Sequence, residues 1–194
     1  QKGAMFGLDA RIALAIVAAI SVVAGASMVQ IMKDRRVDNI LFEQEQVNSA
    51  VKAIQEDLQT NINQALIVNN LDNAYLALID QTLLKPEFEN RWLGPYLPNH
   101  HTGDHKDFGE RSLAQAETSI ATPCTLASRR DRRCFYYYKI TSTPLTIINS
   151  LNSILDGNAE AAPASEGIVQ WQTISGTTAS LHFRIGLVAP STNL

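Results

Sequence analysis

The sequence has no proline in its first 85 residues, only two cysteines, and no excess of basic charge. Because proline breaks helices, its absence permits a very long helix at the start of the chain. A net charge of −3 gives no overall attraction to nucleic acid, so a nucleic-acid partner is not expected. The sequence contains neither a glycine-rich phosphate loop nor Gly-x-Ser-x-Gly, and its four histidines gather mostly in one loop. We therefore expect no enzyme, no cofactor and no resident metal.

The longest uncharged stretch lies at residues 12–32 and contains only three polar side chains, Ser21, Ser27 and Gln30. A helix of this length spans roughly 30 Å, about the thickness of one bilayer hydrocarbon core. The stretch is therefore predicted to be a membrane-spanning helix, and an ordinary single-pass anchor satisfies the same pattern. Within this stretch, Gly25 lowers the stability of the helix by about 1 kcal/mol relative to alanine, so the helix is predicted to be weakest there.

The helical pattern continues beyond the apolar stretch, because residues 26–68 contain no proline and apolar residues recur at spacings of three and four. Glu43 and the residues around it are assigned to a polar face. A helix of well over 50 residues needs its apolar stripe covered. Either a coiled-coil partner or a sheet of the same chain could cover this stripe.

The remainder of the chain supplies such a sheet. A second helix is predicted over 74–84 with Asp72 as its cap, and residues 99–111 read as a polar surface loop. Strand-like runs lie at 113–121, 135–141, 168–174 and 179–187, the last two as a hairpin. A helix with Thr143 as cap and Pro144 as first residue ends at 156–158. The predicted fold class is α+β: a long N-terminal membrane-spanning and amphipathic helix packed on a small antiparallel sheet, with domains at 1–36 and 37–194.

The two cysteines, Cys124 and Cys134, lie far from the apolar stretch. An even pair in a membrane-anchored chain indicates a disulfide and an oxidising compartment. Two free thiols in a cytosolic domain are the alternative. The basic residues Lys33, Arg35 and Arg36 after the apolar stretch favour a cytoplasmic C-terminal part instead.

The N-terminal residues Lys2-Gly3-Ala4-Met5-Phe6-Gly7-Leu8-Asp9, followed directly by the apolar stretch, resemble the processed end of a type IV pilin or pseudopilin. Trp92-Leu93-Gly94-Pro95-Tyr96-Leu97 also resembles a segment that follows the long helix in several members of that family. The resemblance implies cleavage by a prepilin peptidase, either after Ala4, which makes Met5 the mature end, or after Gly3. With Met5 as the end, Asp9 falls at the position of the family's acidic residue.

The resemblance implies a structural subunit of a type IV pilus-like filament, for adhesion, motility or surface contact. Its partners would be other copies of itself, the inner membrane before assembly, the prepilin peptidase and the assembly machinery. The subunit would begin in a bacterial inner membrane and end in an extracellular pilus filament. The residues expected to act in assembly are Met5, Asp9, Ala18, Ala19 and Gly25. Two alternatives stay open: a pseudopilin of a type II secretion system, and a single-pass membrane-anchored binding module.

Two polar clusters stand out in the second half of the chain. His100, His101, Asp104, His105 and Asp107 are enough ligands for a transition metal, although loops of this composition are usually only solvated. Arg129-Arg130-Asp131-Arg132-Arg133, between the cysteines, suits an anionic surface. Because the chain as a whole is acidic, a solvated loop is the plainer interpretation.

Overall fold

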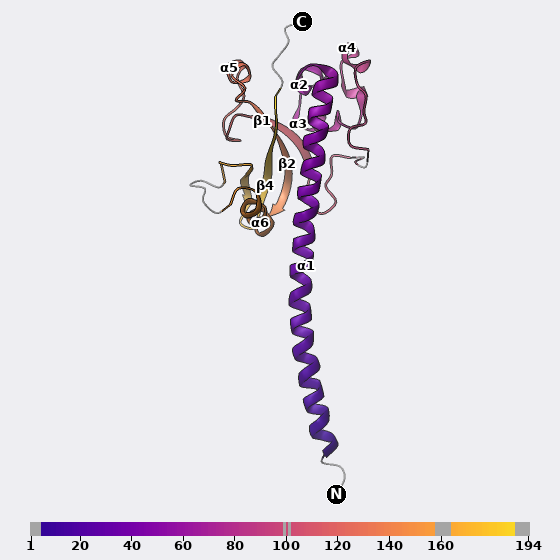
Figure 1. Ribbon diagram of the computed structural model, residues 1–194, viewed down its shortest axis with the longest axis vertical. Coiled ribbons are helices and arrows are strands. Elements are labelled where there is room, and N and C mark those ends of the chain that lie inside the picture. Colours follow the sequence, from indigo (N-terminus) through magenta and orange to yellow (C-terminus); the bar gives the residue numbers. More distant parts are fainter. Residues whose placement is uncertain (1–4, 99, 101, 158–163, 189–194) are drawn as a thin grey trace. The chain divides into compact units, whose positions relative to one another are not determined.

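The computed structural model describes residues 5–98, 100, 102–157 and 164–188 (Figure 1). It divides into two compact units, residues 1–39 and 40–194. The long helix α1 (Met5–Leu58) belongs to both units. The predicted cleavage residues Gly3 and Ala4 lie outside the described residues.

The first unit contains the apolar half of α1, which is helical throughout the described part of the apolar stretch. Two serine hydroxyls donate back along this helix, Ser21 to the Val17 carbonyl at 2.8 Å and Ser27 to the Val23 carbonyl at 3.0 Å. These bonds give each serine a partner within the helix, so neither leaves a polar group unpaired on an apolar surface. The helix is unbroken at Gly25.

In the second unit, α1 places its apolar stripe in the core. Ile40, Val47, Val51, Ile54 and Leu58 are fully buried. Farther along the helix, the Gln55 amide donates to the carbonyl of Leu187 in the sheet at 3.2 Å. The prediction that a sheet of the same chain covers the stripe is therefore confirmed for this half of the helix.

The end of α1 differs from the sequence prediction, which extended the helix through residue 68. Gln59 takes a left-handed backbone with φ 54° directly after Leu58, and a second short helix α2 (Ile62–Ala65) follows. The Asn61 side chain accepts a hydrogen bond from the Gln64 backbone N–H and caps α2. The chain therefore turns where a short polar side chain offers the backbone a competing hydrogen bond.

The predicted helix over 74–84 is wrong, because two short elements replace it, α3 (Leu71–Leu76) and the 3₁₀ turn η1 (Gln81–Leu83); α4 (Pro86–Glu89) follows them. Asn70, and not Asp72, caps α3 by accepting from the Asn73 N–H at 2.6 Å. Asp80 caps η1 in the same manner, which interrupts the helical pattern. Pro86 opens α4 at its first turn, so the Lys85–Pro86 pair begins a helix here.

The sheet contains four antiparallel strands in the order β1-β2-β4-β3. The strands are β1 (Arg111–Ala116), β2 (Phe135–Pro144), β3 (Val169–Ser175) and β4 (Thr178–Leu187). The predicted hairpin between the last two strands is confirmed, with Gly176 and Thr177 as its turn. The first strand begins and ends earlier than predicted, and the second is longer.

The longer second strand changes the start of the following helix, α6 (Leu145–Leu155). Thr143 is a buried residue of β2, and Pro144 occupies the cap position that the sequence had given to Thr143. The predicted stop at Asp156 is confirmed, and Gly157 follows with φ +77°. Asn158 and residues 159–163 of the predicted small-residue loop lie outside the described residues. Helix α6 packs against β2, β3 and β4.

Three consecutive tyrosines of β2 are fully buried. The hydroxyl of Tyr136 accepts from the Ile62 N–H at 2.9 Å, and that of Tyr137 donates to the Glu117 carbonyl at 2.7 Å. Tyr138 lies nearly parallel to Phe183 of β4, with ring centroids 6.4 Å apart. These tyrosines therefore belong to the core.

Both edge strands have a partner on part of their outer side. Ala116 of β1 bridges to Pro123, and the Trp171 N–H of β3 donates to the Ala164 carbonyl at 3.0 Å.

Candidate functional site

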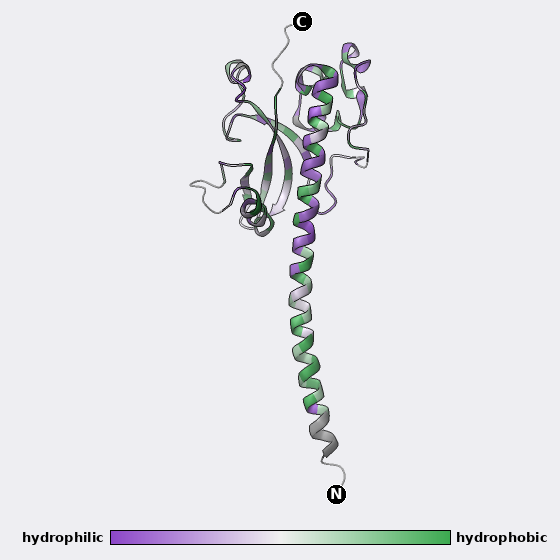
Figure 2. Ribbon diagram, viewed as in Figure 1, coloured by the Kyte–Doolittle hydropathy of each residue, from purple (hydrophilic) through white to green (hydrophobic). Residues whose placement is uncertain are grey.

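The apolar half of α1 is the first candidate site. Among the described residues, α1 is the one helix that is long and apolar enough to cross a membrane, and its apolar residues lie in this half (Figure 2). Ala18, Ala19 and Gly25 are all exposed on it, and nothing lies within 4 Å of the place where a Gly25 Cβ would stand. Ala18 and Gly25 are seven residues apart, about two turns, so they share one face.

The residues expected to begin the assembly segment are only partly described. Met5 is the first residue of α1 and Asp9 lies in its first turns, but the side chains of both are outside the described part. The charge-pairing role expected for Asp9 stays a prediction.

A buried charge cluster in the second unit was missed by the sequence reasoning. Glu43 was assigned to a polar face, but it follows Ile40 by three residues and precedes Val47 by four, and the structure turns it inward. One carboxylate oxygen accepts from the Arg111 Nε at 2.5 Å and from the Tyr138 hydroxyl. The other lies 3.2 Å from the Nε2 of His105. The spacing from Ile40 and Val47 was the signal that could have located Glu43.

These contacts determine the charge of Glu43. Burial by itself would raise the pKa of its carboxyl, but hydrogen bonds from His105, Arg111 and Tyr138, with the Arg111 charge, lower that pKa to about 2. Glu43 is therefore ionised at neutral pH and holds Arg111 of β1, Tyr138 of β2 and the loop residue His105 on α1. Breaking such a buried pair strongly destabilises a fold, because it leaves the other charge uncompensated.

The histidine-rich loop does not assemble metal ligands in its described residues. His105 is buried, and its Nδ1 accepts from the Asp107 N–H at 3.1 Å. The Nδ1 of His100 lies 2.6 Å from the Tyr75 hydroxyl. Asp104 accepts from Arg111 through its backbone carbonyl. These residues pair with the protein, no group of three or more possible ligands occurs in the described part, and His101 is outside it.

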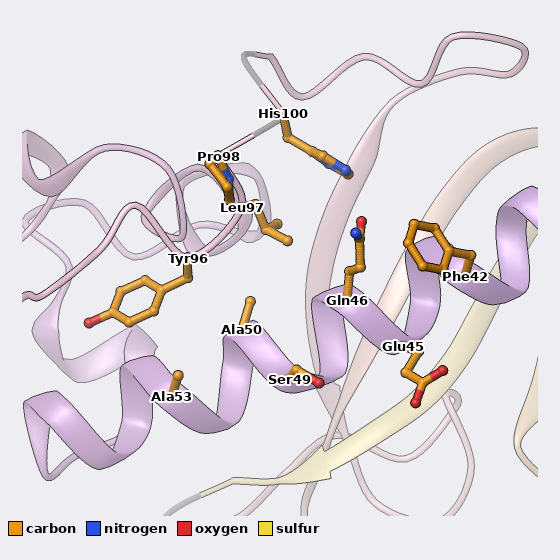
Figure 3. Close-up of a pocket in the computed structure, with 10 residues that line it drawn as sticks. All are labelled: Phe42, Glu45, Gln46, Ser49, Ala50, Ala53, Tyr96, Leu97, Pro98 and His100. Carbon is orange, nitrogen blue, oxygen red and sulfur yellow. The ribbon is translucent and has the colours of Figure 1, made fainter.

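A groove of about 390 Å³ runs between α1 and the segment after the Trp92–Leu97 turn (Figure 3). Phe42, Ala50 and Ala53 line it from the helix, and Leu97 and Pro98 line it from the loop. Figure 3 shows the Phe42 ring and the Gln46 amide rising from α1 toward the loop, where His100 overhangs the groove. Phe42 is 65% exposed, so the groove presents an aromatic ring to solvent.

The turn that walls this groove is held at both ends by aromatic side chains. The Trp92 indole N–H donates to the Ala77 carbonyl at 3.0 Å, and the Tyr96 hydroxyl donates to Asp57 at 2.6 Å. Burial and the Asp57 carboxylate raise the pKa of Tyr96 to about 12, so its hydroxyl stays a donor. Gly94 is required, because a Cβ there would lie 2.6 Å from the Trp92 ring.

The cysteine loop carries the arginines. Cys124 and Cys134 are paired with Cα atoms 5.6 Å apart, a separation that suits a disulfide. Between them stands α5 (Leu126–Arg130), which Thr125 and Ser128 close with a reciprocal capping box. Arg129 donates to the Gln115 side chain at 3.1 Å. Arg132 and Arg133 are exposed.

Comparisons of the chain with protein-family models, with curated proteins and with solved structures found no match in any of the three. The function of the protein is therefore inferred from its own residues.

Proposed function

We propose that the protein is a type IV pilin-like filament subunit. The observation that carries this proposal is the contrast within α1. Its first half is apolar and exposed, and its second half buries its stripe in a four-stranded antiparallel unit of the same chain. A helix of this kind is stored in a bilayer and then covered by equivalent helices of other copies.

The chemistry of the apolar half supports assembly through helix contacts. Within a bilayer or a helix bundle there is little hydrophobic driving force between helices, so association depends on close packing. Ala18, Ala19 and Gly25 permit that approach. Asp9 would pair with the terminal amine of a neighbouring copy, an interaction that is strong where water is excluded.

The experiment that tests this proposal is electron microscopy of cells that express the chain with its assembly machinery, with Asp9→Ala as the variant. We expect fibres from the unaltered chain and at least a tenfold lower fibre yield from Asp9→Ala, with equal amounts of both chains in the membrane. Asp34→Ala is a matched control, because it removes an exposed carboxylate beyond the apolar stretch and should leave the yield unchanged. Normal fibres from Asp9→Ala would remove the charge-pairing role.

A second candidate function, a membrane-anchored binding module, is favoured by the groove beside Phe42. Its volume falls in the range of small-molecule sites, and it combines apolar walls with a few polar groups such as Gln46 and His100. Absence of fibres under all conditions would favour the binding module over the filament subunit. The pseudopilin alternative shares the architecture of the pilin, and gene neighbours would distinguish the two.

A further inference from the structure

The second unit has an uneven distribution of charge. It contains 16 acidic and 11 basic residues, yet four of the arginines stand in the eleven residues from Cys124 to Cys134, here called the basic loop. The segment 72–110, here called the acidic flank, has seven acidic and three basic residues. The unit therefore carries charge of opposite sign in two separate segments.

The two segments lie on different sides of the unit. Figure 1 shows α5 of the basic loop and α4 of the acidic flank on opposite sides of the end of α1. Glu87 and Glu89 of α4 and Arg132 of the basic loop are exposed. None of these three takes part in an ion pair within the described residues.

The basic loop is held in shape and is not a loose tail. The cysteine pair closes it, the Thr125–Ser128 capping box begins its helix, and Arg129 is bound to Gln115. Arg132 has a left-handed backbone with φ 55°, and Arg133 donates to Asp131 at 3.1 Å. A fixed loop loses less conformational freedom when it meets a partner, which favours a specific contact.

We infer that the basic loop of one copy docks on the acidic flank of a second copy, with Arg132 and Arg133 against Glu87 and Glu89. This inference rests on the proposed filament function. The acidic flank of another copy has the sign that Arg132 and Arg133 require, and its exposed Glu87 and Glu89 have no ion-pair partner within the described residues. Because the two surfaces differ, the contact is head-to-tail and repeats along an open chain of subunits.

The test uses two reversed variants of the full chain. Arg132→Glu with Arg133→Glu makes the basic loop acidic, and Glu87→Lys with Glu89→Lys makes the acidic flank basic. Each variant alone should lose about tenfold in fibre yield, because two exposed ion pairs become repulsive. Co-expression of the two variants should restore fibres, because each then offers the sign that the other lacks. Arg35→Glu with Lys52→Glu is the matched control, since it changes the net charge by the same amount at exposed positions outside both the basic loop and the acidic flank.

Salt gives a second readout. At 1 M salt the screening length falls to about 3 Å, so the attraction between exposed charges of two copies becomes weaker. Contacts between apolar helices are not weakened by salt in this way. Fibres of the unaltered chain should therefore break into shorter pieces in 1 M NaCl, and fibres of the control variant should behave in the same way.

The outcomes separate the docking inference from the proposed function. Fibres from both reversed variants at the yield of the control would overturn the docking and leave the filament function standing. If the unaltered chain forms no fibres, the filament function fails. The docking is then decided with the same two variants in detergent by carbodiimide cross-linking, which joins contacting amines and carboxylates. The amines are those introduced by Glu87→Lys and Glu89→Lys, and the carboxylates are those introduced by Arg132→Glu and Arg133→Glu. Cross-linked dimers from the mixture only would support the docking, and equal cross-linking of each variant alone would overturn it.

Discussion

The two halves of α1 use one secondary structure in opposite ways. Between residues 10 and 32 every side chain is exposed, and apolar residues surround the helix. Between Ile40 and Leu58 apolar residues form a stripe that the same chain buries. A stripe can be covered by one neighbour, whereas an all-round apolar surface needs a bilayer or several helices. The second half therefore stabilises the fold, whereas the apolar surface of the first half is left uncovered within the described residues.

The largest expected effect distinguishes the halves directly. Ile54→Ala should lower the free energy of unfolding of the second unit by about 3 kcal/mol, because it leaves a cavity in the core. Ile20→Ala removes the same atoms from the exposed half and should leave that free energy unchanged. Urea unfolding of both variants in the same detergent measures the difference. Equal losses from both would show that the halves do not differ in this way.

Acid should destabilise the second unit through His182, which is buried on β4 with neither ring nitrogen hydrogen-bonded within the described residues. Burial, with the charge of Lys139, lowers the pKa of His182 from 6.5 to about 4. Between those pH values the unfolded chain binds a proton that the folded chain does not. Stability is therefore complete above pH 6.5 and decreases by about 3 kcal/mol as the pH falls to 4.

Thermal unfolding measured from pH 8 to pH 4 reports this loss as a falling unfolding temperature. In His182→Leu the unfolding temperature should change less over this pH range. A variant that retains the full slope would exclude His182 as its source. A further decrease should follow below pH 4.5, because the pKa of Glu43 is lowered in the fold and its stabilisation is lost as the pH falls toward 2. The apolar half has no titrating side chain between residues 12 and 32, so its helix content should not change with pH.

The cysteine pair should contribute roughly 2–3 kcal/mol to the second unit, mainly by restricting the unfolded chain. Replacement of both Cys124 and Cys134 by serine should lower the unfolding midpoint in urea by that free energy. Thiol labelling of the native protein is the accompanying check. Two reactive cysteines in the native state would contradict the pairing.

The smallest effect concerns Gly25 in the exposed half. Gly25→Ala should stabilise the local helix by about 1 kcal/mol without a clash, since nothing lies near the added Cβ. Hydrogen exchange of residues 21–28 in detergent should become slower. If Gly25 gives fibres their extensibility, Gly25→Ala fibres should assemble and resist stretching, and unchanged extension would leave Gly25 as a packing residue.

Sequence patterns predicted the long helix, the hairpin and the helix after Pro144, because periodic apolar spacing and local turn residues determine these elements. They did not predict where α1 ends, because the turn at Gln59 depends on side-chain caps that compete with a helix-compatible sequence. They also placed Glu43 on the wrong face. Its partners, His105, Arg111 and Tyr138, lie 62 to 95 positions away in the sequence, and only the folded chain brings them together.

The partly occupied edges of the sheet have a consequence for a protein that works at high density. An open strand edge invites irreversible strand addition between neighbouring molecules, the route to amyloid. Pro123 beside β1 and Ala164 beside β3 each occupy part of such an edge. These two loop contacts leave fewer free backbone groups on each edge strand for pairing with another molecule.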